Sequence, residues 1–175
     1  ASKEFPGGYR KAGIFYRAVR DYDNAIRVFR EGAEAEPDQK NDYMKDVAGV
    51  LAIQGKDAEA IRILEEVLQK SPKDDQAQAM RAALLVHGGD PKQVQAAVND
   101  LQQVITRSPA NAVVRFNLGR ALVAKGDVEQ AKVQFQEAAR LKPEYIAPKL
   151  ALATLATHRR EYGVALQNAD EVLKL

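Results

Sequence analysis

The sequence contains no cysteine, and this absence removes several kinds of chemistry at once. Disulfide bonds, thiolate metal sites and cysteine nucleophiles are excluded, while the redox compartment stays open because a chain without cysteine tolerates either one. The chain also lacks any run near the roughly 20 apolar residues that span a bilayer. Its first residues show no apolar segment typical of a signal peptide. We therefore expect a soluble protein without direct membrane insertion, in either the cytoplasm or a bacterial periplasm.

An excess of one charge is missing as well. Lysine and arginine number 26 and aspartate and glutamate 24, which gives a net charge of +2 without a long run of one sign. This balance gives no electrostatic reason to expect a nucleic acid or a membrane surface as the partner. Hydrophobic residues make up 46% of the 175 residues, which is enough to bury one continuous core.

Patterns typical of catalytic and metal sites are also absent. The two histidines, His87 and His158, are about two repeats apart, and acidic residues do not cluster near them at metal-ligand spacing. The glycine-containing turns at residues 6–8 and 88–90 lack the lysine and the serine or threonine of a phosphate-binding loop. We therefore expect no catalytic residue, no cofactor and no metal, and we do not expect an enzyme.

A repeat runs through the whole chain. Prolines stand at positions 37, 72, 109 and 143, so the interval between them is nearly constant. The residues 12, eight and five positions before each proline are alanine, a large apolar residue, and a small or apolar residue: Ala25, Phe29 and Gly32; Ala60, Leu64 and Val67; Ala97, Leu101 and Val104; Ala131, Phe135 and Ala138. This spacing keeps one helical face apolar, and a period of this length indicates stacked helix pairs.

Each copy of the repeat predicts two antiparallel helices. Small residues such as Gly119 and Ala131 let the helices approach, and Phe135 fills the space between them. In residues 55–57 and 126–127, the glycine can end a helix in the left-handed conformation and the aspartate can cap the next helix. The proline then stops the second helix, because it cannot continue the backbone ladder.

The clearest copy, from Asn117 to Pro143, closely resembles the tetratricopeptide repeat (TPR) family, and its bacterial members most of all. This resemblance implies an all-α, right-handed α-solenoid of helix-turn-helix pairs. We expect a single array over residues 1–175 with about five pairs, at about 6–39, 41–74, 75–111, 112–145 and, truncated, 146–175. Because the sequence stops in mid-helix, we interpret it as a piece of a longer protein. The third copy is three residues longer, and we expect the extra residues in the turn at 87–93.

The resemblance also implies a function. In this family the first helices usually line a groove that binds a peptide or helix of another protein. The family's contact positions fall here on Arg10, Arg17, Lys45, Val113, Phe116, Arg120, Val123 and Leu150. We therefore expect a protein–protein interaction scaffold without catalysis. A hydrophobic peptide or helix would sit near Phe116, and Arg120 would bind its carboxylate or a hydrogen-bonding group.

Two alternative functions remain. The apolar residues Leu166, Ala169, Val172 and Leu173 of the last pair are compatible with self-assembly, as a homodimer through the carboxy-terminal end or by end-to-end stacking. A related family of helical repeats binds single-stranded RNA, but the basic residues predicted along the groove are too sparse for this function. The clamp by which some members of the family bind a terminal carboxylate is excluded, because Ile14 and Asp46 occupy positions that require asparagine.

Overall fold

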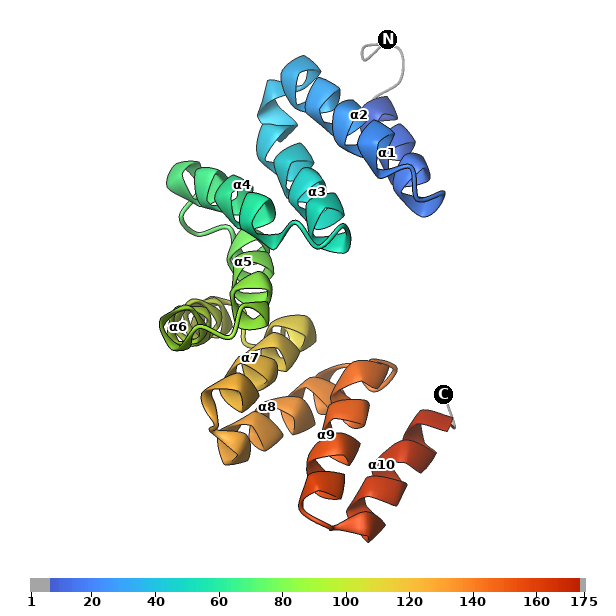
Figure 1. The fold of residues 1–175 in the computed structure, drawn as a ribbon, viewed down its shortest axis with the longest axis vertical. Coiled ribbons are helices and arrows are strands. Elements are labelled where there is room, and N and C mark those ends of the chain that lie inside the picture. Colours follow the sequence, from blue (N-terminus) through green and yellow to red (C-terminus); the bar gives the residue numbers. More distant parts are fainter. Residues whose placement is uncertain (1–6, 174–175) are drawn as a thin grey trace. The chain divides into compact units, whose positions relative to one another are not determined.

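The computed structural model describes residues 7–173, and within this range it contains α-helices, one short 3-10 helix and no strand. Figure 1 labels the ten α-helices, whose bounds are α1 (Gly8–Ala18), α2 (Tyr22–Ala35), α3 (Lys40–Ile53), α4 (Asp57–Lys70), α5 (Asp75–His87), α6 (Pro91–Arg107), α7 (Ala112–Lys125), α8 (Val128–Leu141), α9 (Ile146–His158) and α10 (Tyr162–Leu173). The 3-10 helix η1 (Pro37–Gln39) precedes α3. The helices follow one another as five pairs, an odd-numbered first helix and an even-numbered second helix, which confirms the predicted all-α class.

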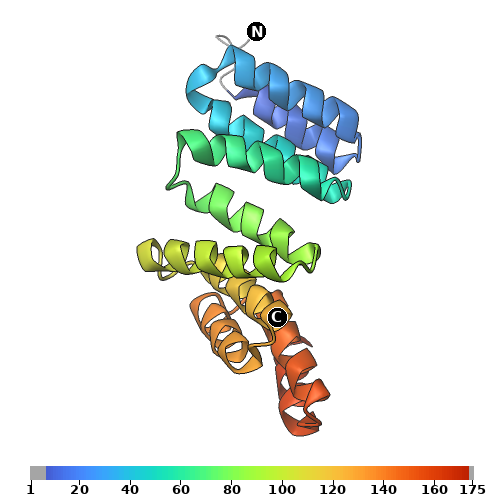
Figure 2. The same ribbon diagram turned by 60° about the vertical axis from the view of Figure 1, so that its left-hand side comes forward.

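The helices form two compact units, unit 1 (residues 1–84) and unit 2 (residues 85–175). In unit 1, α2 packs against α1 and α3, and α3 also packs against α4 (Figure 2). In unit 2, α7 packs against α6 and α8, and α9 packs against α8 and α10. Every one of these contacts joins helices that follow each other in the chain, as in stacked repeats. Across residues 7–173, no helix has the length and apolar character needed to cross a membrane.

Glycine sets the distance between the two helices of the first and fourth pairs. A Cβ atom on Gly13 of α1 would lie 2.3 Å from the ring of Phe29 in α2, and one on Gly119 of α7 would lie 2.4 Å from the ring of Phe135 in α8. Both rings are buried, with 0% of Phe29 and 2% of Phe135 exposed. The predicted role of Gly119 and Phe135 in helix packing is therefore confirmed.

The turn inside each pair contains a residue in the left-handed region of the backbone. Gly55, Gly89 and Gly126 have φ values of 73°, 68° and 89°, and Arg20 and Arg160 both have a φ of 62°. At Gly126 the backbone N–H donates to the carbonyl of Val123, and the N–H of Asp127 donates to the carbonyl of Leu122. This pair of bonds ends the helix as a Schellman motif. The same two bonds recur around Arg20, Gly55 and Arg160.

Aspartate caps the second helices in some pairs but not where we predicted. Asp127 occupies the N-cap position of α8, yet its carboxylate accepts a hydrogen bond from the side chain of Gln130 and does not cap the backbone. Asp57 is the first residue inside α4, so the N-cap position belongs to Lys56. Asp21 is a true cap of α2, because its carboxylate accepts a bond from the backbone N–H of Asn24.

The three extra residues of the third copy lie within residues 87–93, as predicted, but they form the first turn of α6 and not a longer turn between helices. The turn between α5 and α6 has three residues, as does the turn between α3 and α4, whereas α6 has 17 residues and α4 has 14. Asp90 accepts hydrogen bonds from the backbone N–H groups of Lys92 and Gln93, and Pro91 stands at the first helical position. These two signals start α6 early, so the additional residues extend its first turn.

Candidate functional site

Unit 2 exposes apolar side chains on two successive first helices. Val113 and Val123 of α7 are 47% and 40% exposed, and Ile146 and Leu150 of α9 are 43% and 50% exposed. We call these four residues the α7–α9 surface. At 3.6 residues per turn, Val113 and Val123 lie on the same side of α7. Leu150 occupies the same position in its repeat as Phe116 does in the preceding one. Exposed apolar groups on successive first helices are a feature of binding surfaces.

Phe116 lies half-buried beside this surface. Its ring centroid is 5.6 Å from that of Phe135 in α8 and 5.4 Å from that of Tyr145, the N-cap residue of α9. Such separations are typical of stabilising aromatic pairs. Phe116 therefore joins three helices of unit 2 and contributes part of its ring to the surface.

Arg120 supplies a positive charge at the same place. Its Nη2 atom is 3.2 Å from Nε2 of His87, the last residue of α5, and both side chains are at least partly exposed. Burial raises the pKa of Tyr145, and the positive charge of Arg120 opposes this rise. The α7–α9 surface thus has a cationic group next to apolar and aromatic side chains, a combination that suits an apolar segment carrying a carboxylate.

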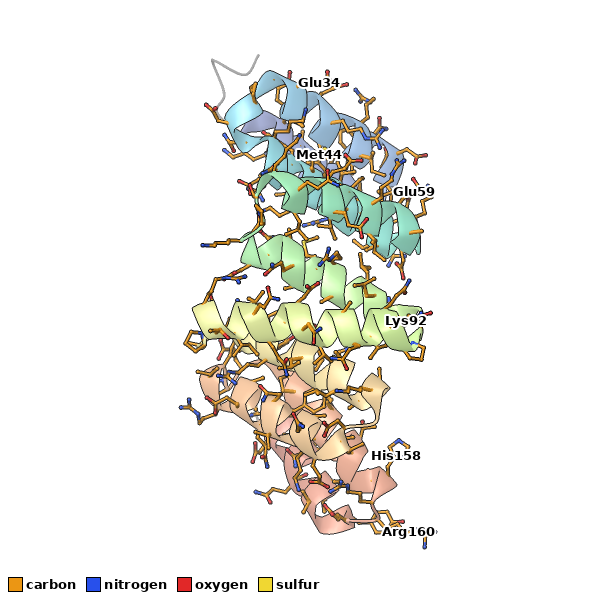
Figure 3. The ribbon with its side chains drawn as sticks, turned by 90° about the vertical axis from the view of Figure 1, so that its left-hand side faces the viewer. Glu34, Met44, Glu59, Lys92, His158 and Arg160 are labelled. Atoms are coloured by element: carbon orange, nitrogen blue, oxygen red, sulfur yellow. The ribbon has the colours of Figure 1, made fainter. Side chains whose placement is uncertain are left out.

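A shallow hollow of about 670 Å³ adjoins Val113. Its walls come from the turn between α6 and α7 and the turn between α8 and α9, at residues 108–113 and at Leu141, Lys142 and Glu144. A second depression of about 240 Å³ lies between α8, α9 and α10, where an ion pair between Arg159 and Glu129 joins the α9–α10 turn to α8. His158 and Arg160, beside this turn, point away from the helices (Figure 3).

Lys45, which we predicted to contact a partner, is buried in unit 1 and only 6% exposed. Its Nζ atom is 2.9 Å from Asp42 and 2.8 Å from Asp74, which precedes α5. Burial lowers the pKa of Lys45, but the hydrogen bonds to Asp74 and Asp42 outweigh this effect and raise it overall. Lys45 therefore holds α3 to the start of α5 and offers little surface to a partner.

The other two basic residues predicted for the groove differ in their surroundings. Arg10 of α1 forms an ion pair with Asp46 of α3, with Nε 2.8 Å from the carboxylate oxygen. Arg17 is half-buried. Ile14 of α1 and Ile53 of α3 are 43% and 56% exposed, so the first helices of unit 1 also carry exposed apolar side chains.

The exposed Ile146 and the contact between Arg120 and His87 were missing from our prediction. Ile146 is the first residue of α9, and this residue is not one of the family's contact positions. His87 lies 33 residues before Arg120, so the spacing of one repeat brings the two together. The contact between His87 and Arg120 could therefore have been predicted from their spacing in the sequence.

The fold defines an all-α repeat protein whose helix pairs follow one another in chain order. Two matches to the tetratricopeptide repeat family, at residues 10–75 and 90–155, agree with this class. The chain belongs to the tetratricopeptide repeat family.

Two proteins of similar sequence are distant relatives. The chain is 24% identical over 162 residues to ER membrane protein complex subunit 2-B of Xenopus laevis, a match that covers 89% of this chain and 53% of that protein. The corresponding subunit 2 of Xenopus tropicalis gives the same identity and coverage. The chain thus spans about half the length of the curated relatives it matches.

Solved structures of similar fold include three bacterial proteins. TTC0263, a thermophilic TPR protein of Thermus thermophilus, has a TM-score of 0.82 at 17% identity, and the match covers 94% of this chain and 88% of that one. PilF of Pseudomonas aeruginosa has a TM-score of 0.79 at 22% identity, with 95% and 74% covered. MamA of Desulfovibrio magneticus RS-1 has a TM-score of 0.74 at 22% identity, with 95% and 92% covered. These likenesses concern the fold, and they confirm the predicted α-solenoid class.

Proposed function

We propose that this protein is an interaction scaffold that binds an apolar peptide or helix of another protein on the α7–α9 surface, without catalysis. The observation that carries the proposal is the exposure of Val113, Val123, Ile146 and Leu150 on two successive first helices of one compact unit. Membership of the tetratricopeptide repeat family supports the general role in protein interaction.

The partner's chemistry follows from the side chains that surround this surface. Branched aliphatic groups favour a segment with leucine, isoleucine, valine or phenylalanine at helical spacing, which buries its apolar face on binding. Arg120 stands beside them with a partly exposed guanidinium. A carboxylate on the partner would pair with that guanidinium and fix the direction of the bound segment.

The test compares three forms of the protein. Val113→Glu combined with Leu150→Glu places two charges on the α7–α9 surface, and Val133→Glu places one on α8, where Val133 is 57% exposed. All three positions are substantially exposed, so the substitutions leave the core untouched. Phe116 is unsuitable for this test, because its contacts with Phe135 and Tyr145 make a charge there destabilising.

Each form is used as bait in a pull-down, and the captured proteins are compared by quantitative mass spectrometry. We expect the wild type and Val133→Glu to capture the same proteins and the double variant to lose them. The strongest of these proteins is then reduced to its binding segment by synthetic peptides. Equal capture by all three forms, with equal far-UV circular dichroism, would refute a binding role for the α7–α9 surface.

A further inference from the structure

The second helices have four positions that face the core. In α2, counted back from Pro37, these positions are occupied by Tyr22, Ile26, Phe29 and Ala33. Phe29 and Ala33 are 0% and 4% exposed, and Tyr22 and Ile26 pack against the core of unit 1. The first helix of the following pair, α3, packs against α2.

In α10 the same positions carry apolar side chains, and the three large ones remain exposed. Counted one repeat on from α8, they are Tyr162, Leu166, Ala169 and Leu173. Tyr162, Leu166 and Leu173 are 64%, 63% and 83% exposed. We call these four residues the α10 face. Its pattern is that of a helix face that packs against another helix.

The matching surface is exposed on α1. Phe15 occupies the repeat position that Val50 holds in α3 and Ala121 holds in α7. Both of these residues are 0% exposed, and both helices have a preceding second helix packed against them. Phe15, by contrast, is 62% exposed, and Val19, one turn further on, is 56% exposed. We call Phe15 and Val19 the α1 face.

The two helices carry opposite charges. In α1 the charged residues are Arg10, Lys11 and Arg17, whereas in α10 they are Asp170 and Glu171. Neither helix contains a residue of the other sign. Arg10 and Glu171 already pair with Asp46 and Lys149. The remaining charges, Lys11 and Arg17 against Asp170, favour contact between the two helices over contact of either one with itself.

The packing of α3 on α2 shows which ends would meet. Tyr43, near the start of α3, lies against Gly32, near the end of α2, so these helices run antiparallel. Phe15 then approaches Leu166, because the residues at the same repeat positions in the last two pairs, Leu155 of α9 and Lys132 of α8, line one depression. The apolar side chains of the two faces therefore meet in this register.

We propose that copies of this chain associate head to tail, with the α1 face of one copy packed on the α10 face of the next, as α3 packs on α2 within one copy. The two faces differ, so each pair of copies keeps one free α1 face and one free α10 face, and growth continues with concentration. The variants that test this association, Phe15→Glu and Leu166→Glu, lie outside the α7–α9 surface, so its failure and that of the peptide-binding function are distinguishable.

Sedimentation velocity on residues 1–175 tests the proposal. We expect the wild type to grow from a monomer to dimers and larger species as its concentration rises to about 1 mM, the range of weak dissociation constants. Phe15→Glu and Leu166→Glu are each expected to remain monomeric, and Val133→Glu, a charge on an exposed position of α8, is expected to associate like the wild type. A wild type that stays monomeric throughout would overturn the proposal.

Mixing the two defective variants distinguishes head-to-tail contact from other dimers. Phe15→Glu keeps a working α10 face and Leu166→Glu keeps a working α1 face, so an equimolar mixture should form a 1:1 dimer that cannot grow. A mixture that stays monomeric, or Phe15→Glu associating by itself through paired α10 faces, contradicts the proposed contact.

The opposite charges of the two helices supply a second check. Asp170→Lys removes the net negative charge of α10 and should weaken association at low salt. Unchanged association of this variant at low salt would contradict the charge complementarity of α1 and α10.

Discussion

A Cβ atom on Gly119 would come within 2.4 Å of the ring of Phe135, so the closest approach of α7 and α8 depends on a missing methyl group. The first pair has the same relationship between Gly13 and Phe29, with the glycine and the ring equally far apart in sequence. In both pairs, the glycine makes room for a ring that is almost completely buried.

Gly119→Ala should therefore destabilise the protein by about 1–3 kcal/mol, the usual cost of overpacking a filled core. Gly49→Ala is the matched control, because a Cβ atom there would meet only Met80, at 3.8 Å, and alanine favours the helix interior by about 0.5–1 kcal/mol. Urea unfolding followed by circular dichroism measures both changes. Two shifts of the same sign would contradict the packing role of Gly119.

The left-handed turns predict that glycine stabilises the fold at positions 126 and 160, which are equivalent in their repeats. Arginine at position 160 has a φ of 62°, a conformation that costs a side-chain-bearing residue about 1–2 kcal/mol. Arg160→Gly removes this strain, and part of the gain is offset by the greater freedom of glycine in the unfolded chain. We expect a gain of at most about 1 kcal/mol, and a loss of about 1–2 kcal/mol for Gly126→Ala. Thermal unfolding that lowers Tm for Arg160→Gly would contradict this account.

The buried charge of Lys45 predicts a large effect of its removal. Lys45→Met leaves Asp42 and Asp74 without their shared cation, and breaking a pair of this kind costs about 3 kcal/mol. Arg27→Met removes an exposed pair with Glu31 on α2 and should cost less than about 1 kcal/mol. Denaturant unfolding measures the loss of stability in both variants. Similar losses would show that the ion pairs of Lys45 with Asp42 and Asp74 stabilise the fold no more than a surface pair does.

Tyr43 predicts a loss of stability in alkaline solution. Its side chain is completely buried and its hydroxyl donates a hydrogen bond to Glu36, at 2.8 Å. Burial, followed by the bond to Glu36, raises the pKa of Tyr43 to about 12. The neutral phenol is favoured in the folded state, so this contribution is complete below pH 10 and is lost as the pH rises from about 10 to about 12.

This shift corresponds to on the order of 2–3 kcal/mol. Tyr43→Phe should lower stability at neutral pH by about 1 kcal/mol through the lost hydrogen bond. The same variant should also flatten the fall in stability above pH 10. Unfolding curves measured at several pH values, with tyrosinate absorbance as the titration signal, check both effects. A parallel fall in wild type and variant would rule out Tyr43 as the titrating group.

The fold was predictable because its determinants repeat along the sequence. Alanine, a large apolar residue and proline recur at fixed spacing. Each copy therefore predicts the same helix pair, and the agreement between copies strengthens the prediction. The length of α6 was not predicted, because the two glycines at 88 and 89 favour a longer turn. The Asp90-Pro91 pair, which starts the helix, was the more decisive local signal.

The site was predictable only in part, because charges depend on neighbours that are distant in sequence. A lysine at a family contact position gives no sign of burial unless Asp74, 29 residues away, is known to lie beside it. The packing of Phe116 likewise depends on Tyr145, which is 29 residues away at the N-cap position of α9. The exposure of Val113, Val123 and Leu150 was easier to predict, since it follows from helical position alone.

The early start of α6 shows where this architecture can change in length. Its additional residues precede Ala97, so the spacing from Ala97 to Pro109 is the same as in the other repeats. Length added before a second helix therefore leaves the register of the core unchanged. A short peptide tag inserted between Gly89 and Asp90 would keep the Asp90 cap and everything after it, and would give association measurements a label remote in sequence from both α1 and α10.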